Sequence, residues 1–254
     1  MMKVAVLGAH GRMGQQVCSA VETAQDMTVV ARLDREDKVS SLRSSDVDVA
    51  VDFTVPDVTE DNVHALIDAG IHAVVGTTGW TPQRLARVEE HLAQLGNRTG
   101  VLIAPNFGLS AVLAMTFARQ AARFFESVEV VELHHPNKVD APSGTARHTA
   151  AGIAAARREA GMSPSPDATQ EGFEARGMDV DGVRVHAVRL RGLVAHEEIL
   201  LGNEGEQLTI RQDSFDRASF MPGVLLGIRE VPSRPYLTVG LENVMDLGLG
   251  TPRS

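Results

Sequence analysis

Short apolar runs alternate with amphipathic stretches in the N-terminal part of the chain. Runs of this kind are typical of strands that a sheet buries on both faces, and the stretches between them repeat their apolar positions with helical spacing. The pattern predicts strands over 3–7, 28–33, 47–53, 72–75 and 101–104, and helices over 12–24, 57–69 and 82–95. Gly70 is expected to end the second of these helices. Strands that alternate with helices indicate an α/β fold with a parallel sheet.

The pattern changes after residue 108. A polar segment rich in Pro and Gly, 161–182, separates a mostly helical part from a series of strand-like runs. The sequence predicts helices over 109–125 and 145–159, and strands over 128–134, 184–190, 193–201 and 206–212. Short turns between the last runs favour a mixed open sheet.

The last predicted elements, a helix over 218–230 and a strand over 236–241, return to the first domain. We therefore predict a dinucleotide-binding domain made of 1–107 plus 218–254. An α+β domain for substrate binding, 108–217, is inserted into it.

A glycine-rich turn lies between the first predicted strand and the first predicted helix. It has the spacing GxxGxxG, and Asp34 ends the next strand, where an acid can bind ribose hydroxyls. Glycines let the backbone approach a pyrophosphate at a helix N-terminus, so the domain is expected to be Rossmann-like. The predicted cofactor-binding residues here are Gly8, Ala9, His10, Gly11, Arg12, Met13, Asp34 and Arg35. An ordinary glycine turn is the alternative.

The acid and the cation at the end of this strand favour different cofactors. Asp34 argues for NADH, whereas the guanidinium of Arg35 can hold the 2′-phosphate of NADPH. We therefore expect use of both NADH and NADPH. Two later turns follow strands of the same sheet and are expected to border the nicotinamide: Gly76, Thr77 and Thr78, and Ala104, Pro105, Asn106 and Phe107.

The segment from His134 to Ala146 gathers groups suited to proton transfer and anion binding. Lys138 stands out because the chain has three lysines against 21 arginines, and lysine, unlike arginine, can release its proton. The turn of Ser143, Gly144 and Thr145 opens a predicted helix and can hold a carboxylate. We expect this segment to bind and protonate a small carboxylated substrate. The alternatives are a solvated loop lysine and structural histidines.

Composition narrows the class of protein. The formal net charge is -9 without a long basic run, which argues against a nucleic-acid or membrane partner. Cys18 is the single cysteine, and no His, Cys, Asp or Glu set has the spacing of a metal site, so we predict no metal. No signal peptide and no membrane span are recognisable, which predicts a cytoplasmic protein.

With these residues in view, the chain resembles the 4-hydroxy-tetrahydrodipicolinate reductases, also called dihydrodipicolinate reductases, of the diaminopimelate route to lysine. The resemblance runs nearly end to end and is greatest for the actinobacterial branch. The motifs that carry it are the GxxGxxG turn, Val51–Thr54, Gly76–Gly79, Ala104–Phe107, Glu132–Lys138, Asp140–Thr145, Gly192–Glu197 and Ser219–Gly223.

The resemblance implies roles for the central segment. His134 is expected to be a proton donor or acceptor and Lys138 a proton donor. The substrate-binding residues are expected to be His135, Ser143, Gly144 and Thr145. It further implies hydride transfer to ring carbon C4 of a cyclic dicarboxylate. It also implies a homotetramer, with tetramerisation through the 108–217 domain.

Two other functions fit part of the pattern. An aspartate or homoserine dehydrogenase shares the two-domain plan but lacks the His-His-Pro-x-Lys and Pro-Ser-Gly-Thr combination. A sensor that binds NAD(H) without turnover has no need of a proton donor such as Lys138.

Overall fold

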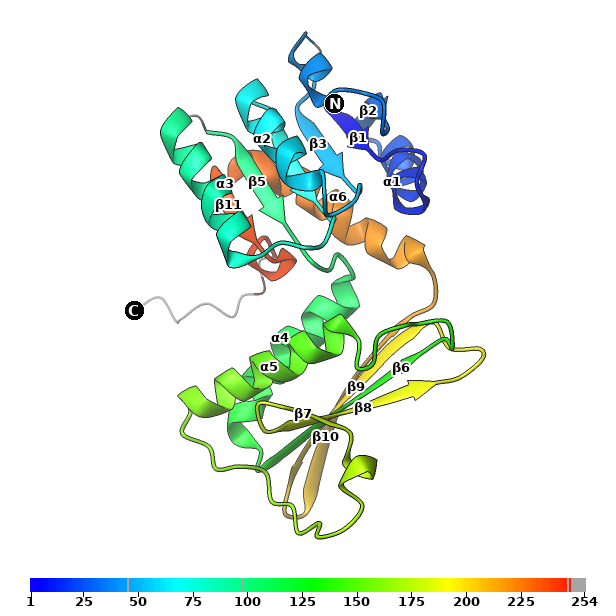
Figure 1. Cartoon of the computed structure of the whole chain (residues 1–254), viewed down its shortest axis with the longest axis vertical. Helices are drawn as coiled ribbons and strands as arrows, with labels where there is room; N and C mark the ends of the chain where they lie inside the picture. The colour runs from blue at the N-terminus through cyan, green and yellow to red at the C-terminus, as the bar shows by residue number, and fades with distance from the viewer. Residues whose placement is uncertain (45, 97, 246, 248–254) are drawn as a thin grey trace. The chain divides into compact units, whose positions relative to one another are not determined.

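The chain, seen as a computed structural model, divides into two compact units (Figure 1). The structure describes residues 1–44, 46–96, 98–245 and 247. The first unit comprises Met1–Gly108 and Phe220–Ser254, and the second comprises Leu109–Ser219. The sequence placed these limits at 107/108 and 217/218. The roles assigned to the two units stay predictions.

The first unit is built on a six-stranded sheet in which every pair of strands is parallel. The strand order is β11-β5-β4-β3-β1-β2. Its elements are β1 (Met2–Leu7), α1 (Arg12–Thr23), β2 (Met27–Leu33), β3 (Val49–Asp52), α2 (Thr59–Ala69), β4 (His72–Val75), α3 (Pro82–Leu95), β5 (Gly100–Ile103), α6 (Met221–Glu230) and β11 (Tyr236–Val239). The predicted parallel α/β fold is therefore confirmed.

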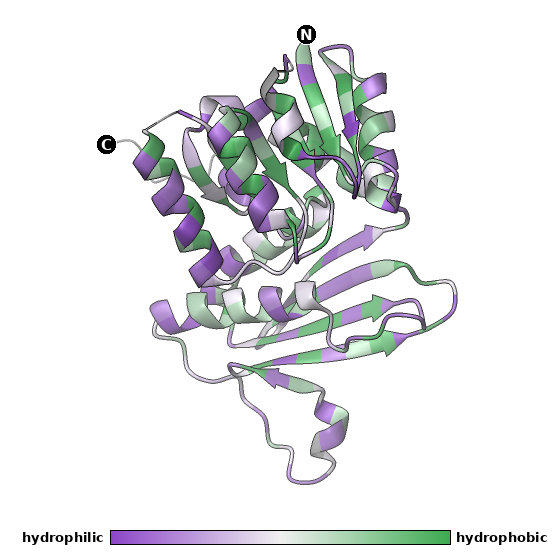
Figure 2. Ribbon diagram, turned by 45° about the horizontal axis from the view of Figure 1, so that its top comes forward, coloured by the Kyte–Doolittle hydropathy of each residue, from purple (hydrophilic) through white to green (hydrophobic). Residues whose placement is uncertain are grey.

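Helices cover both faces of this sheet, as its mostly apolar strands require. Ala5 joins a buried cluster with Leu66 of α2 and Leu92 of α3. Val4 and Val6 are fully buried on the opposite face, where α1 packs against α6. The apolar strands and the polar outer sides of the helices are visible in Figure 2.

The helix ends follow from local sequence. Gly70 ends α2 with φ of 70°, in the left-handed region that glycine tolerates, as predicted. The hydroxyl of Thr81 accepts the N–H of Arg84 at the start of α3, where Pro82 occupies the first turn.

The second unit is built on a mixed five-stranded sheet with the order β10-β9-β6-β8-β7. Its elements are α4 (Leu109–Ala121), β6 (Ser127–His134), α5 (Gly144–Glu159), β7 (Met178–Val180), β8 (Val183–Arg189), β9 (Ala195–Asn203) and β10 (Glu206–Ser214). Only β6 and β8 pair in parallel. Helices α4 and α5 pack on one face, where Ile153 and Ile199 lie in a buried cluster. Polar and apolar bands alternate along these strands in Figure 2.

One strand of this sheet was not predicted from the sequence. The segment 161–182 contains β7, which pairs with β8 through the turn at Asp181 and Gly182. These two residues have φ of 53° and 89°. Asp-Gly between two strands is a recognised hairpin signal, because such a turn needs positive φ at both positions. The sequence contains this signal, but β7 has only three residues and is too short to show a strand pattern of its own.

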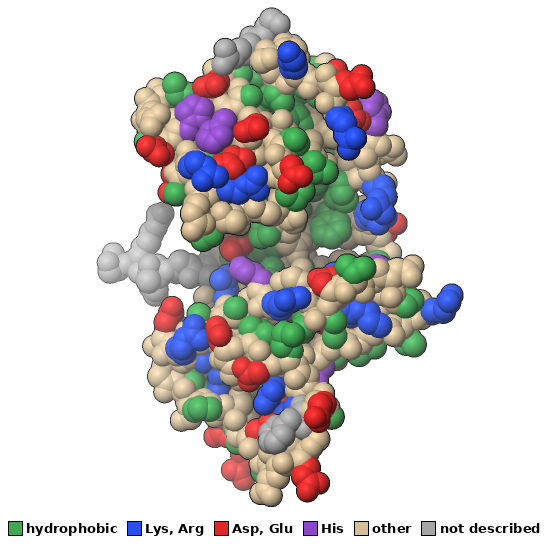
Figure 3. Space-filling view, viewed as in Figure 1, with side chains coloured by type: hydrophobic (Ala, Val, Ile, Leu, Met, Phe, Trp, Pro, Cys, Tyr) green, Lys and Arg blue, Asp and Glu red, His purple; other side chains and the backbone are tan. Residues whose placement is uncertain are grey.

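The surface shown in Figure 3 carries Lys and Arg side chains interspersed with Asp and Glu, without a broad basic area. Within the described part of the chain, no helix is long and apolar enough to span a bilayer.

Candidate functional site

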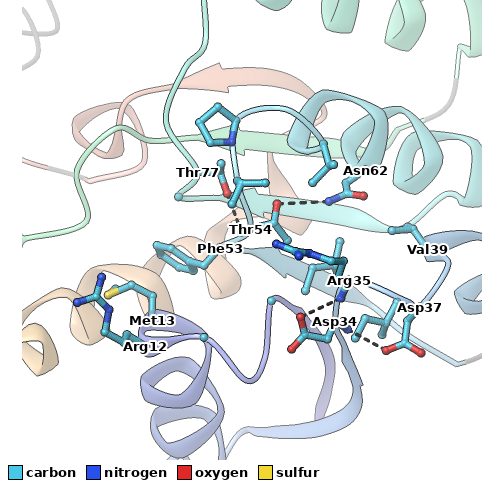
Figure 4. A pocket seen from close by; sticks show the side chains of 18 of the residues that line it. Arg12, Met13, Asp34, Arg35, Asp37, Val39, Phe53, Thr54, Asn62 and Thr77 are labelled. Atoms are coloured by element: carbon cyan, nitrogen blue, oxygen red, sulfur yellow. Dashed lines mark hydrogen bonds between the residues drawn. The ribbon is translucent and has the colours of Figure 1, made fainter.

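A pocket in the first unit lies at the carboxyl ends of the parallel strands (Figure 4). Its volume is about 580 Å³, and the turns after β1, β2, β3 and β4 form its walls. The chain turns from β1 to β2 on one side and later places β3 on the other side of β1. Open α/β sheets bind ligands at such a switch of direction.

The turn between β1 and α1 has room for backbone only. Gly8 has φ of +75°, and a Cβ there would lie 2.6 Å from the carbonyl oxygen of Phe53. A Cβ on Gly14 would lie 2.0 Å from the carbonyl oxygen of Gly8. The described residues give α1 no side-chain cap at Gly11 and no acid in its first turn. Free N–H groups and the positive helix end suit a pyrophosphate, so the turn fits a dinucleotide.

Asp34 presents an ionised carboxylate beside this turn. The backbone N–H of Arg35 donates to its Oδ1 at 2.8 Å, and Nδ1 of His10 lies 2.9 Å from its Oδ2. These contacts hold the pKa of Asp34 below its usual value, with the N–H of Arg35 as the larger cause. Figure 4 shows Arg35 in the same pocket as Asp34. The pocket therefore offers an acceptor for ribose hydroxyls and a cation for an added phosphate.

Asp52 fixes the turns that form the far wall of this pocket. Its side chain is fully buried at the end of β3. Its Oδ1 accepts the N–H and hydroxyl of Thr54 and the hydroxyl of Thr77, and its Oδ2 accepts from Thr59 and Asn62. One carboxylate thus ties together the ends of β3 and β4 and the start of α2. Thr59 and Asn62 were not predicted from the sequence as partners of Asp52, since no local pattern connects them to this turn.

Nine of the predicted cofactor residues line the pocket: Gly8, Gly11, Arg12, Met13, Asp34, Arg35, Gly76, Thr77 and Thr78. Ala9 and His10 belong to the same turn but lie outside the lining. The segment Ala104, Pro105, Asn106 and Phe107 also lies outside it. Phe107 is 2% exposed, and its ring centroid lies 5.9 Å from that of Phe53. Contact of any of these residues with a cofactor stays a prediction.

In the second unit, His134 forms a short hydrogen bond with a buried carboxylate. Its Nδ1 lies 2.5 Å from Oε2 of Glu132, and Glu132 is fully buried. Arg189 donates to both oxygens of Glu132, each at 2.8 Å. The backbone N–H of Ser143 donates to Oε1 at 2.9 Å. Glu132 therefore connects β6, β8 and the start of α5.

The surroundings of this pair fix its protonation. Burial raises the pKa of Glu132, but hydrogen bonds from Arg189, His134 and Ser143 lower it further than burial raises it. Burial lowers the pKa of His134, Glu132 opposes this, and the charges of Lys138 and Arg189 add to the lowering. At neutral pH the carboxylate is ionised and the imidazole is neutral. Its proton lies on Nδ1, facing Glu132, and Nε2 carries a lone pair.

A second carboxylate connects Lys138 to the helix start. Nζ of Lys138 lies 2.8 Å from Oδ1 of Asp140, and the N–H of Gly144 donates to Oδ2 at 3.3 Å. Lys138 lowers the pKa of Asp140 through this hydrogen bond. Asp140 therefore engages two of the groups that the sequence assigns to the substrate site.

At the start of α5, Ser143 caps the helix and the next two residues, Gly144 and Thr145, begin its first turn. Ser143 is 3% exposed, and its hydroxyl accepts the N–H of Ala146 at 3.1 Å. Ser143, predicted to bind substrate, is in this conformation the N-cap of α5, because both its N–H and its hydroxyl are engaged inside the unit. Gly144 and His135 are exposed, and Thr145 is half-buried.

Comparison with known proteins identifies the family. The family model described as "Dihydrodipicolinate reductase, N-terminus" matches residues 2–107, and "Dihydrodipicolinate reductase, C-terminus" matches residues 110–245. The chain belongs to the dihydrodipicolinate reductase family. It is therefore an oxidoreductase, as the sequence predicted.

Two relatives are similar in sequence to this chain over nearly its whole length. The 4-hydroxy-tetrahydrodipicolinate reductase of Beutenbergia cavernae is 64% identical over 97% of this chain and 99% of its own length. That of Corynebacterium diphtheriae is 60% identical over the same shares. The structure of a dipicolinate-bound dihydrodipicolinate reductase from Paenisporosarcina sp. TG-14 has a TM-score of 0.89 at 36% identity, covering 96% of this chain and 100% of that one.

The family assignment settles the competing functions. An aspartate dehydrogenase from Thermotoga maritima has a TM-score of 0.50 at 12% identity, a likeness of fold alone. The other dehydrogenases and the sensor are therefore set aside. Membership of the reductase family and the Rossmann-like sheet imply a nicotinamide cofactor. Within the described residues, no group of three or more His, Cys, Asp or Glu side chains could hold a metal ion.

Two residues next to His134 were not predicted as site residues. Glu132 was named only as part of the motif Glu132–Lys138, and Arg189, which binds Glu132, was given no role. An acid two positions before a predicted catalytic histidine on one strand shares its face, and that was the available signal.

Proposed function

We propose that this chain reduces 4-hydroxy-tetrahydrodipicolinate, a six-membered ring with two carboxylates, to tetrahydrodipicolinate. The observation that carries the proposal is the pairing of His134 with Glu132 next to Lys138 and the open start of α5. These groups combine proton transfer with carboxylate binding. The dipicolinate bound by the Paenisporosarcina relative, a small dicarboxylate, supports this substrate class.

The first unit is proposed to hold the cofactor. Backbone N–H groups of the turn from Gly8 to Met13 bind the pyrophosphate, and Asp34 accepts the ribose hydroxyls. Arg35 tolerates a 2′-phosphate, so we propose that NADH and NADPH are both used. When bound, the reduced nicotinamide supplies a hydride to ring carbon C4.

Lys138 is the better proton donor of the two candidates. The neutral imidazole of His134 offers a lone pair at Nε2, because its proton faces Glu132. His134 therefore accepts a hydrogen bond from the substrate and orients it. Loss of the C4 hydroxyl as water leaves a conjugated ring, and the ammonium group of Lys138 protonates the ring carbon next to C4 on which negative charge develops once C4 has received the hydride. A positioned acid contributes a factor of about 10² to 10⁴ in rate.

The carboxylates are proposed to lie at the start of α5. The N–H groups of Gly144 and Thr145 hold one of them, aided by the positive end of the helix. The exposed imidazole of His135 binds the second carboxylate or the ring. Ser143 contributes by capping the helix, which keeps these N–H groups in place.

The test follows oxidation of NADH and, separately, of NADPH, with substrate generated from pyruvate and aspartate semialdehyde by the preceding synthase. Oxidation should require the synthase and should fall at least about 10²-fold in His134→Ala and Lys138→Ala. The exposed His148→Ala and Lys38→Ala serve as controls and should retain full activity. No oxidation by a protein that still binds the cofactor would exclude the proposed reaction.

Assembly and location are further parts of the proposal. We propose a cytoplasmic homotetramer that associates through the second unit, where Leu190 is 59% exposed and Phe215 is 74% exposed. Light scattering should then give a mass of four chains of 27.2 kDa each. A monomeric mass at micromolar concentration would contradict this part alone.

A further inference from the structure

Glu197 is a buried carboxyl group with few partners. It lies on β9, is 2% exposed, and stands directly opposite Glu132 on β6 and Gln212 on β10. Its Oε1 lies 2.9 Å from the hydroxyl of Thr149, and its Oε2 has no hydrogen-bond partner. A carboxylate buried in this way has to be paired with a cation, fully hydrogen-bonded, or protonated.

No cation neutralises Glu197 in the described part of the chain. Arg189 of β8 and His134 of β6 are bound to Glu132, which is itself negative. The groups that meet Glu197 from the other elements are neutral: Gln212 of β10, Thr149 of α5 and, through Gln212, Ser110 of α4. The one charge that faces Glu197 is therefore of the same sign.

The single proton of the Thr149 hydroxyl also indicates that Glu197 is protonated. The hydroxyl of Thr149 lies 3.1 Å from the carbonyl oxygen of Thr145 and 2.9 Å from Oε1 of Glu197. A carbonyl oxygen can only accept, and a hydroxyl has one proton to give. With Glu197 ionised, Thr149 has to share its one proton between the two acceptors. Both hydrogen bonds are fully formed when Glu197 carries a proton and donates to Thr149, which then donates to Thr145. Burial, helped by the charge of Glu132, raises the pKa of Glu197 to about 7.

We propose that Glu197 is a positioning residue. While it is protonated, it holds the carboxylate-binding turn at the start of α5 through Thr149, and it adds no second negative charge next to Glu132. Ionisation of Glu197 would place a second negative charge next to Glu132. It would also draw the proton of Thr149 away from Thr145. Both changes oppose a bound carboxylate. This inference rests on the proposed binding of a substrate carboxylate by Gly144 and Thr145.

The experiment measures the dissociation constant of pyridine-2,6-dicarboxylate by calorimetry between about pH 5.5 and about pH 8.5. In the unaltered protein, binding should weaken above about pH 7, by about tenfold for each further pH unit. In Glu197→Gln, whose amide donates to Thr149 but does not ionise, this part of the pH dependence should vanish. Glu198→Gln, on the opposite face of β9, is the matched control and should behave like the unaltered protein.

The outcomes separate the two proposals. Equal pH profiles in the unaltered protein and Glu197→Gln would overturn the inference and leave the proposed function intact. Failure of the unaltered protein to bind the probe at any pH would overturn the proposed function as well. If Glu197→Gln does not fold, infrared spectra of the unaltered protein provide the test. A protonated-carboxyl band that titrates near pH 7, and that is lost in Glu197→Met, which has no carboxyl group, supports the inference. Absence of that band overturns it.

Discussion

The ammonium group of Lys138 forms an ion pair with the carboxylate of Asp140, with 2.8 Å between Nζ and Oδ1. The other oxygen of Asp140, Oδ2, accepts the N–H of Gly144. An internal carboxylate thus occupies a cation and a helix N–H that we assign to the substrate. Asp140 is therefore expected to compete with a substrate carboxylate for the N–H of Gly144, and it pairs with the ammonium group that we propose as the proton donor.

Asp140→Asn should remove this competition. We expect the dissociation constant of pyridine-2,6-dicarboxylate to fall about tenfold, since a charge-assisted hydrogen bond contributes about 1.5–3 kcal/mol. Calorimetry at pH 7.5 measures the change. Asp181→Asn, at the turn between β7 and β8, is the control and should not alter binding. Weaker binding in Asp140→Asn would mean that Asp140 orients Lys138 instead of competing with substrate.

Glu132→Gln should impair turnover by altering His134. Because Glu132 raises the pKa of His134 against the effect of burial, its loss should lower that pKa further, and NMR titration of the imidazole reports the shift. We expect kcat/KM to fall by about 10² as the imidazole loses its fixed orientation.

Glu129 provides a matched control for this substitution. It lies on the same strand and likewise binds an arginine and a histidine, Arg176 and His186. Glu129→Gln should cost similar stability but leave kcat/KM within about twofold of the unaltered protein. An equal loss of activity in both variants would show that the effect is one of stability.

Glu197 should make the stability of the protein fall as pH rises. Its pKa is raised from 4.5 to about 7, so its contribution is fully present below about pH 4.5 and is lost as pH rises through about 7. Relative to Glu197→Gln, the loss should be on the order of 3 kcal/mol. Urea unfolding of both proteins at about pH 5 and about pH 8 measures it. A constant difference in the free energy of unfolding would contradict the raised pKa.

Substitutions at the end of β2 should separate the two cofactors. Asp34→Ala should raise KM for NADH about tenfold, and Arg35→Ala should raise KM for NADPH by a similar factor, since each removes one charge-assisted contact. Steady-state kinetics with each cofactor measures both. Arg32→Ala, which removes a cation from β2 outside the pocket lining, should change neither. Equal effects of Arg35→Ala on both cofactors would argue against a 2′-phosphate contact.

Arg157→Met should destabilise the second unit. Arg157 is 6% exposed and donates to the carbonyl groups of Ala122, Phe125, Glu126 and Ser163. Its loss would remove the donor that these four carbonyl groups share, at a cost of about 2–4 kcal/mol. Denaturant unfolding measures the loss. The exposed neighbour Arg158→Met should cost less than about 0.5 kcal/mol.

Local sequence determined the parts of this protein that depend on neighbours along the chain. The apolar strands and the helix stop at Gly70 follow from periodicity and from backbone freedom. The glycine turn at Gly8–Gly14 lies between a strand and a helix, so its ligand class could be predicted without coordinates. The segment from His134 to Thr145 was found in the same way, because its proton-transfer and anion-binding groups are contiguous.

Only the tertiary structure decided which carboxylates act on these groups. Glu132 meets Arg189 because β6 and β8 pair in parallel, and it faces Glu197 because β6 and β9 pair in one register. Asp52 likewise collects donors from α2 and from the turn after β4. A strand's partner and register are set by burial of the whole sheet, and a pKa by the water and charges that this burial removes or brings near. Neither is encoded in a local pattern, so the neutral His134 and the protonated Glu197 emerge only from the folded chain.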